Sequence, residues 1–127
     1  MSNKNMDENY KWGDYRDLIV WQKSMDLVVA VYGLTKEYPS SELYSLVAHT
    51  NKTVVSIPSN IAEGRRRGSV TDFRHFLIIA IGSGAELETQ IEIAKRLKLA
   101  KEASFIKVDN LLNEVMRILN KMINNRG

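Results

Sequence analysis

The sequence has 127 residues, of which 44% are hydrophobic and 26% are charged, which is the size and composition of one folded domain and excludes a disordered chain. It contains 0 cysteines, which excludes disulfides, thiolate zinc sites, iron–sulfur clusters and a cysteine nucleophile. The 18 basic and 15 acidic residues give a net charge of +3, which is compatible with a polyanionic partner without being evidence for one.

Residues 1–16 carry no targeting signal and no helical pattern. They are polar apart from Tyr10, Trp12 and Tyr15 and lack the apolar core of a signal peptide, so we expect a flexible N-terminal tail. The longest purely apolar run, residues 76–81, is far shorter than the ~20 residues that a membrane span requires. We therefore expect a cytoplasmic protein that does not contact membranes.

The first predicted helix covers residues 17–37. Asp17 is expected to cap its start by accepting a backbone N–H, and Pro39 stops it because the residue before a proline avoids the α region. Apolar residues that step by three and four form one broad face from two rows, Leu18, Trp21, Met25, Val28 and Tyr32 in one and Val20, Leu27, Val31 and Leu34 in the other.

A second helix is predicted to follow Ser40 and Ser41, which are both good N-cap residues, and to end at Gly64. Pro58 removes one backbone donor inside this helix and should kink it near Val54. The apolar face of the helix consists of Leu43, Leu46, Thr50, Val54, Ile57 and Ile61.

A third helix is predicted to begin at a capping box, Ser69-Val70-Thr71-Asp72, and to run to about Lys98. Its apolar face consists of Phe73, Leu77, Ala80, Gly84, Leu87, Ile91 and Ala94. After a break at residues 99–101, a fourth helix presents Val108, Leu111, Val115, Ile118 and Met122, widened by Leu112, Leu119 and Ile123.

Four helices joined by short loops predict an all-α fold, an antiparallel up-down-up-down four-helix bundle over residues 17–127. A competing interpretation makes residues 76–81 or 28–32 a buried strand. It is the weaker one, because the helical stepping extends well beyond both runs and strands are usually shorter than that.

Few residues offer catalytic or metal-binding chemistry. Gly82-Ser83-Gly84 resembles half of a nucleotide-binding loop, but it lies inside a predicted helix, where small residues at a close helix crossing are the better explanation. A di-iron bundle needs two Glu-x-x-His pairs, and only Asp72 and His75 approach that form. We therefore expect no enzymatic activity, no metal and no cofactor.

Two polar rows border the apolar faces of the second and third helices. They consist of Ser56, Asn60 and Glu63 on the second helix and Ser83, Glu86 and Gln90 on the third. These rows predict either a hydrogen-bond network between the helices at the rim of the core or a polar surface that lines an oligomer contact or channel.

The candidate nucleic-acid-binding residues form a basic corner where the second helix meets the third. They are Lys52, Arg65, Arg66, Arg67 and Arg74. Arginine binds phosphate through two parallel hydrogen bonds, and the start of a long helix adds a positive dipole end. A solvated loop is an equally open interpretation. The helical period assigns Phe73 and Phe76 to the core, so base stacking is not predicted.

Four stretches carry a family resemblance, namely Leu18–Lys23, Val55–Gly64, Phe76–Ser83 and Ala85–Gln90. The chain resembles the small bacterial four helix bundle protein family, which includes proteins encoded in intervening sequences of large-subunit ribosomal RNA genes. It is also similar to the accessory variability determinant of diversity-generating retroelements. The resemblance covers about residues 15–123 and is most specific at Ser56–Gly64.

This resemblance implies an antiparallel four-helix bundle that assembles as a ring-like homopentamer without enzymatic activity. For the retroelement relatives it implies a basic surface that binds nucleic acid and an association with a reverse transcriptase. Where family members often carry two adjacent arginines, this chain has Asn51 and Lys52, and only Lys52 keeps the charge. The two resulting hypotheses are a bundle that binds structured RNA or other nucleic acid through phosphates and an interaction scaffold without nucleic-acid contact.

Overall fold

Helices form the regular secondary structure of the computed structural model, which describes residues 13–124. The long helices are α2 (Ile19–Thr35), α3 (Ala48–Arg66), α4 (Val70–Arg96) and α5 (Ile106–Asn124). Short 3₁₀-helices lie at η1 (Tyr15–Asp17), η2 (Ser40–Glu42) and η4 (Glu102–Phe105), and η3 (Leu43–Val47) is a π-helical turn. No strand occurs within residues 13–124, so the predicted all-α fold class is confirmed and the alternative of a buried strand is wrong.

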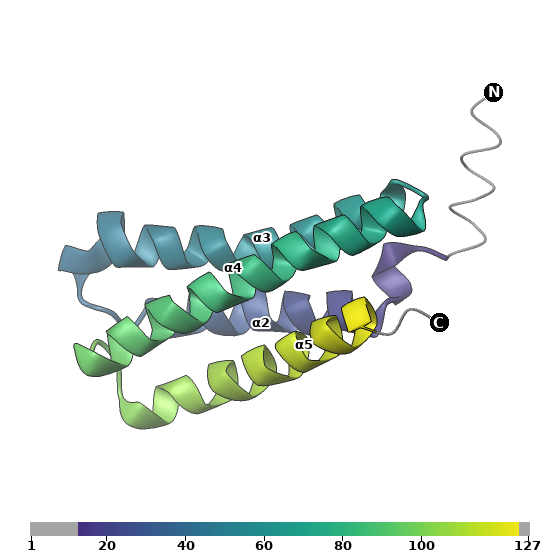
Figure 1. The fold of residues 1–127 in the computed structure, drawn as a ribbon. Coiled ribbons are helices and arrows are strands. Elements are labelled where there is room, and N and C mark those ends of the chain that lie inside the picture. Colours follow the sequence, from purple (N-terminus) through teal and green to yellow (C-terminus); the bar gives the residue numbers. More distant parts are fainter. Residues whose placement is uncertain (1–12, 125–127) are drawn as a thin grey trace.

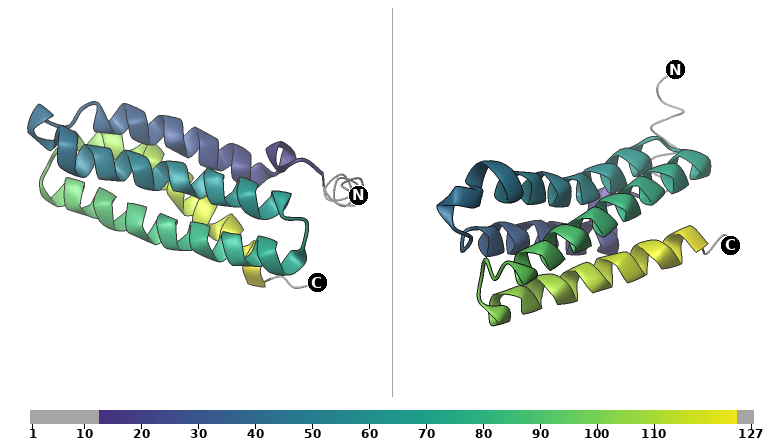
Figure 2. Two further views of the ribbon diagram at one scale, coloured as in Figure 1. Left: turned by 90° about the horizontal axis from the view of Figure 1, so that it is seen from above. Right: turned by 60° about the vertical axis from the view of Figure 1, so that its left-hand side comes forward.

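The long helices lie side by side as a bundle (Figures 1 and 2). Pairs of contacts give the direction of neighbouring helices. Between α3 and α4, Gln90 Nε2 lies 3.0 Å from Thr53 Oγ1, while Gly64 packs against Phe76, so these two helices run antiparallel. The chain reverses between α3 and α4 at the end of the bundle where α2 begins (Figure 1).

One apolar row of each helix faces the common core. In α2 the buried side chains belong to the row that contains Val20, Leu27, Val31 and Leu34. The second row of α2 lies at the margin instead, where Met25 and Tyr32 are exposed. A helix that packs in a bundle buries one stripe, so the broad face predicted for α2 is divided between the core and the surface.

Two of the predicted helix starts are wrong. Asp17 does not cap α2; it lies within η1, and the side chain of Asp14 caps η1 by accepting the backbone N–H of Arg16 at 2.8 Å. Neither Ser40 nor Ser41 caps a helix, because both residues lie within η2, which follows Pro39 without a side-chain cap. The predicted cap at Ser69 is confirmed, since its hydroxyl oxygen accepts the backbone N–H of Asp72 at 3.1 Å.

The predicted role of Gly64 as a helix terminator is also wrong. Helix α3 continues through Gly64 to Arg66, and the glycine with positive φ that follows this helix is Gly68, at +79°. A Cβ atom on Gly64 would lie 2.6 Å from Phe76 Cβ, so this position is glycine because α3 and α4 approach closely there.

The close crossing expected at residues 82–84 exists at one of the two glycines. A Cβ atom on Gly84 would collide with Met116 Sδ of α5, whereas a Cβ atom on Gly82 would meet nothing within 4 Å. Gly84 is therefore explained by helix packing, and Gly82 faces outward.

Candidate nucleic-acid interface

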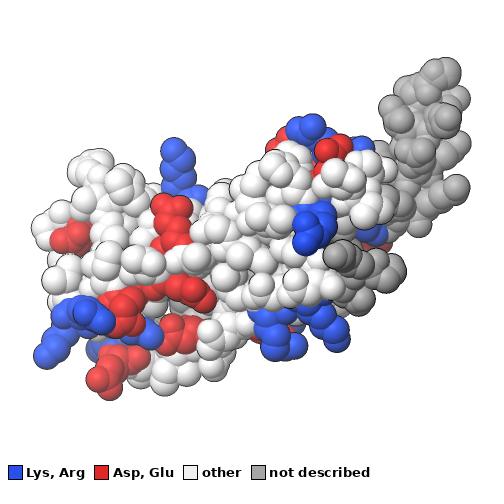
Figure 3. Space-filling model, viewed as in Figure 1, with Lys and Arg blue, Asp and Glu red and all other residues white. Residues whose placement is uncertain are grey.

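Three consecutive arginines end α3 beside the start of α4 and beside η1. Arg66 and Arg67 are exposed, and Arg65 is half-buried. On the face drawn in Figure 3, acidic and basic side chains are mixed over the left half, and basic side chains with a few acidic ones lie towards the end where α3 meets α4. The structure therefore keeps Arg65, Arg66 and Arg67 together at one corner of the bundle, as the sequence predicted.

Each of these arginines lies over an aromatic ring. The guanidinium carbon of Arg65 lies 5.3 Å from the centroid of the Phe73 ring, and that of Arg67 lies 5.0 Å from the centroid of Phe76. The Tyr15 ring lies 5.9 Å from the guanidinium carbon of Arg66. A cation within about 6 Å of a ring centroid is attracted by the quadrupole of the ring.

A fourth arginine joins this group from the N-terminal side. The guanidinium carbon of Arg16 lies 4.5 Å from the centroid of Tyr15, the ring that Arg66 also approaches. We call Arg16, Arg65, Arg66 and Arg67 the arginine corner. Both phenylalanines are partly buried, and both rings lie beneath arginines. Phe73 packs against the core as predicted, whereas Phe76 is not part of the core cluster, so its assignment to the core is corrected.

Sequence reasoning missed Arg16 because residues 1–16 were assigned to a flexible tail. Residues 1–12 lie outside the described residues, but residues 13–16 belong to the ordered segment around η1. The Tyr15 ring packs edge-on against Trp21 with centroids 5.4 Å apart, and Gln22 Nε2 donates to Arg16 O at 2.9 Å. The available signal was Asp14, which caps the N–H two residues later in the pattern of an Asx turn.

Burial and carboxylates set the electrostatics of the corner. Partial burial lowers the pKa of Arg65 from its usual value. The Glu63 carboxylate, 2.7 Å from Arg67 Nη2, raises the pKa of Arg67. The backbone N–H and the charge of Arg16 hold the pKa of Asp14 below its usual value, and Arg66 adds to this effect. Carboxylates therefore engage two of the four guanidinium groups, those of Arg16 and Arg67.

The other two predicted contacts are Arg74, which binds the end of α5, and Lys52, which lies farther along α3. Arg74 Nε donates to Ile123 O at 3.4 Å, at the C-terminal end of α5, where a cation offsets the negative dipole end. Lys52 is exposed on α3, roughly 20 Å along the helix axis from Arg65 at a rise of 1.5 Å per residue. Helical periodicity places Lys52 on nearly the same face of α3 as Arg66.

Basic residues at the other end of α4 are engaged in ion pairs. Lys95 Nζ lies 2.7 Å from Asp109 Oδ2, and Arg96 Nε lies 3.1 Å from Glu92 Oε2. These pairs give the cations near the end of α4 a structural role, since cations there also offset the negative end of the helix dipole.

The polar rows form bonds mainly within their own helices. Ser56 Oγ donates to Thr53 O at 2.6 Å, and Asn60 Nδ2 donates to Ser56 O at 2.8 Å. Gln90 is the member that crosses between helices, because its Nε2 donates to Thr53 Oγ1. Of the predicted network between the two polar rows, the structure therefore contains one hydrogen bond from α4 to α3, which Gln90 donates.

Two features that would indicate other classes of function do not occur in residues 13–124, namely a metal-binding cluster and a membrane-spanning helix. Within residues 13–124, no cluster of three or more histidine, aspartate or glutamate side chains could hold a metal ion. Over the same range, none of the helices combines the length and the apolar character that crossing a bilayer requires.

A family model described as 23S rRNA-intervening sequence protein matches residues 16–121. The matched range begins at Arg16 of the arginine corner and extends into the last turns of α5. No curated protein sequence matches the chain.

Proposed function

Because this chain belongs to the 23S rRNA-intervening sequence protein family, we propose that it is a non-enzymatic, oligomeric helical-bundle protein that binds structured RNA in the cytoplasm. The observation that carries the proposal is the arginine corner, where guanidinium groups from η1 and the end of α3 lie at one end of the bundle. The family description concerns ribosomal RNA, which makes RNA the first polyanion to test.

Arg66 is the member of the corner best placed to bind phosphate. It is exposed, and among the described residues it forms no ion pair. Lys52, on nearly the same face of α3, would contact a second phosphate farther along the RNA. Arg65 and Arg74 would add positive potential, since each is also held by contacts within the protein.

Fluorescence anisotropy with a labelled RNA hairpin, measured over a range of salt concentrations, tests this proposal. The double variant Arg66→Ala, Arg67→Ala should bind more weakly at low salt. A plot of the logarithm of the binding constant against the logarithm of the salt concentration has a negative slope. Its magnitude should decrease by about 0.9 for each phosphate that the variant no longer neutralises. The control is Arg96→Ala, which removes an exposed arginine at the other end of α4. Unchanged affinity of the double variant, with circular dichroism showing an intact fold, would refute the assignment.

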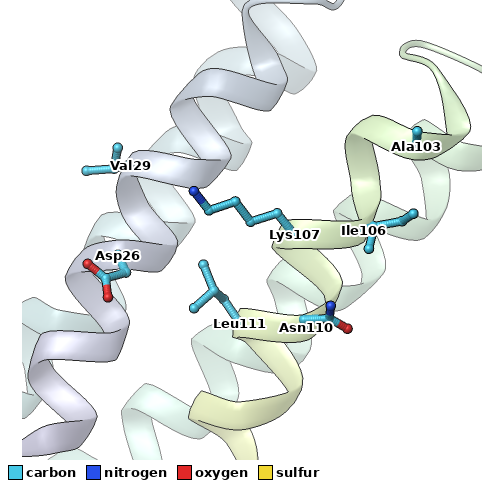
Figure 4. A pocket seen from close by; sticks show the side chains of 7 residues that line it. All are labelled: Asp26, Val29, Ala103, Ile106, Lys107, Asn110 and Leu111. Atoms are coloured by element: carbon cyan, nitrogen blue, oxygen red, sulfur yellow. The ribbon is translucent and has the colours of Figure 1, made fainter.

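An exposed apolar groove between α2 and α5 favours a second candidate, a homo-oligomeric interaction scaffold without direct nucleic-acid contact. The groove has a volume of about 830 Å³ and is lined by Asp26, Val29, Ala103, Ile106, Lys107, Asn110 and Leu111 (Figure 4). Val29 is 72% exposed and Ile106 is 58% exposed. Such side chains are typical of a surface that another chain covers. We propose that a second copy of this chain occupies the groove and that the resulting assembly is a pentameric ring. A reverse transcriptase is a partner that such a scaffold would bind.

Light scattering after size exclusion, together with a heparin column, separates the two candidates. An oligomer that the double variant Val29→Asp, Ile106→Asp disrupts would support assembly through the groove, and five times the chain mass would identify a pentamer. Elution from heparin only at raised salt favours the polyanion binder. An oligomer that does not bind heparin or RNA favours the scaffold. A monomer at micromolar concentration contradicts both candidates, because each of them is oligomeric.

A further inference from the structure

We propose that the arginine corner binds unpaired nucleotides, and that their bases stack on the guanidinium planes of Arg16 and Arg67. The inference rests on the proposed RNA-binding function and names the class of RNA that the corner takes. It depends on one arrangement that occurs twice, in which a guanidinium carbon lies over an aromatic ring while a carboxylate accepts hydrogen bonds from the guanidinium nitrogens.

The first platform is built from Tyr15, Arg16 and Asp14. The Arg16 guanidinium carbon lies 4.5 Å from the Tyr15 ring centroid, and Arg16 Nη1 donates to Asp14 Oδ1 at 3.2 Å and to Oδ2 at 3.0 Å. The ring contact with Trp21 fixes Tyr15 in turn. The Arg16 plane is therefore held before any ligand arrives.

The second platform is built from Phe76, Arg67 and Glu63. The Arg67 guanidinium carbon lies 5.0 Å from the Phe76 ring centroid, and Arg67 Nη2 donates to Glu63 Oε2 at 2.7 Å. Phe76 is fixed by its close contact with the backbone of α3 at Gly64. An aromatic ring, a guanidinium and a carboxylate thus occur together a second time, here at the end of α3 and the start of α4.

From these contacts we infer that the two arginines would meet nucleic acid with a guanidinium face rather than with an edge. A phosphate binds the N–H edge of arginine, and in both platforms a carboxylate already holds part of that edge. The Arg16 and Arg67 side chains are nevertheless 56% and 50% exposed. A guanidinium face is a stacking surface for an unpaired base, whereas bases in a duplex are already stacked on each other.

Arg66 completes the site between the two platforms. It follows Arg65 directly in sequence, precedes Arg67 and lies within 5.9 Å of the Tyr15 ring. Arg66 forms no ion pair among the described residues. The N–H edge of its guanidinium would therefore bind a backbone phosphate while the neighbouring bases stack.

The chain offers a matched control for the Arg67 platform. Arg96 pairs with Glu92 four residues earlier, just as Arg67 pairs with Glu63, but no ring lies under its guanidinium in the part of the chain that the structure describes. Replacing either arginine by lysine keeps the charge and removes the plane. A difference between the two replacements therefore reports stacking rather than charge.

The experiment compares a hairpin carrying 2-aminopurine in its loop with a blunt duplex of the same length, using the full chain. We expect the protein to bind the hairpin on the order of tenfold more tightly than the duplex and to change the fluorescence of 2-aminopurine. Arg16→Lys and Arg67→Lys should remove this preference without changing duplex affinity or its salt dependence. Arg96→Lys should behave as the wild type.

Two results would overturn the inference alone. Equal affinity for hairpin and duplex, or lysine variants at positions 16 and 67 that behave as Arg96→Lys does, would show that the corner reads only phosphate charge, and the proposed function would stand. If the wild type binds neither RNA at low salt, the proposed function and the inference fail together.

Discussion

Gly64 of α3 lies so close to Phe76 of α4 that a Cβ atom at position 64 would be 2.6 Å from Phe76 Cβ. The same added atom would lie 3.3 Å from Phe73 Cδ1. Phe73 and Phe76 carry the guanidinium groups of Arg65 and Arg67. A single glycine therefore sets both the spacing of two helices and the position of the rings at the arginine corner.

Replacing Gly64 by alanine should destabilise the protein, although alanine is the better helix former. Alanine gains about 1 kcal/mol in intrinsic helix propensity over glycine. Overpacking at a contact with Phe76 Cβ, which cannot rotate away, costs about 1–3 kcal/mol and should exceed that gain. Urea denaturation of Gly64→Ala should therefore show a reduced free energy of unfolding.

Two glycines of α4, Gly82 and Gly84, provide the controls for Gly64→Ala. Gly82→Ala should stabilise the protein by up to about 1 kcal/mol, because nothing lies within 4 Å of the new Cβ atom. Gly84→Ala should fall between the two, since Met116 is flexible and can move its sulfur aside. Equal stabilisation by all three replacements would show that the α3–α4 approach is not tight.

The four long helices could be predicted from the sequence, because the apolar period of each helix persists over many turns. The core positions of α4, such as Leu77, Leu87 and Ile91, are those that the period predicts. The helix starts at Asp17 and Ser40 could not be fixed in this way, because several neighbouring residues can cap and tertiary packing selects among them. Gly64 was misassigned for a related reason: a glycine that ends a helix and a glycine that admits a neighbouring helix look alike in one sequence.

The positive charge of the candidate site could be predicted from the sequence, but the packing of its arginines on aromatic rings could not. Three adjacent arginines are visible in the sequence, but the rings beneath them come from η1 and from the first turns of α4. Phe73 and Phe76 obey the core period, but both are only partly buried. Arg16 could not be predicted, because Asp14 binds its guanidinium and Trp21 packs against the Tyr15 ring beneath it, and no helical period reveals these contacts.

A second prediction concerns Lys98, which has a φ of 55° after the end of α4. Leu99 N donates to Ala94 O at 3.0 Å, and Lys98 N donates to Lys95 O at 3.1 Å, which are the two bonds of a Schellman motif. Glycine adopts this left-handed conformation without the roughly 1 kcal/mol cost that a side chain imposes. Lys98→Gly should therefore raise the melting temperature in a thermal scan.

The control for Lys98→Gly is the same replacement at Lys101, where φ is −66°. Glycine offers no conformational relief there and adds entropy to the unfolded chain, so stability should fall slightly. A gain of stability at Lys101 equal to that at Lys98 would contradict the explanation from backbone conformation.

A third prediction tests the hydrogen bond between Gln90 Nε2 and Thr53 Oγ1, which joins α4 to α3. Both side chains are buried, and Thr53→Val would leave the Gln90 amide without this acceptor, which should cost about 1–3 kcal/mol. Adding Gln90→Leu removes the stranded amide as well, so the double variant should be more stable than the sum of the two single losses predicts. A double-mutant cycle from urea denaturation measures this coupling, and strictly additive losses would show that the bond contributes nothing.

The last prediction is a loss of stability at alkaline pH that depends on Tyr38. Burial raises the pKa of the Tyr38 phenol to about 12, and Glu37 adds to the effect. The unfolded phenol has a pKa of about 10, so the folded state holds this proton more tightly. Its contribution is fully present below pH 10 and is lost as the pH rises through 12, by up to about 3 kcal/mol in the free energy of unfolding.

Tyr38→Phe isolates this contribution from the other groups that titrate in the same range. The Tyr38 hydroxyl is buried and has no hydrogen-bond partner among the described residues, so its removal breaks no bond and should leave stability at pH 7 equal or higher. Between pH 10 and pH 12 the phenylalanine variant should lose less stability than the wild type in urea titrations. Tyr44→Phe, which removes a hydroxyl from a side chain that is 90% exposed, should follow the wild-type curve. Parallel curves for the wild type and Tyr38→Phe would show that the phenol ionises without cost, and hence that water reaches it in the folded state.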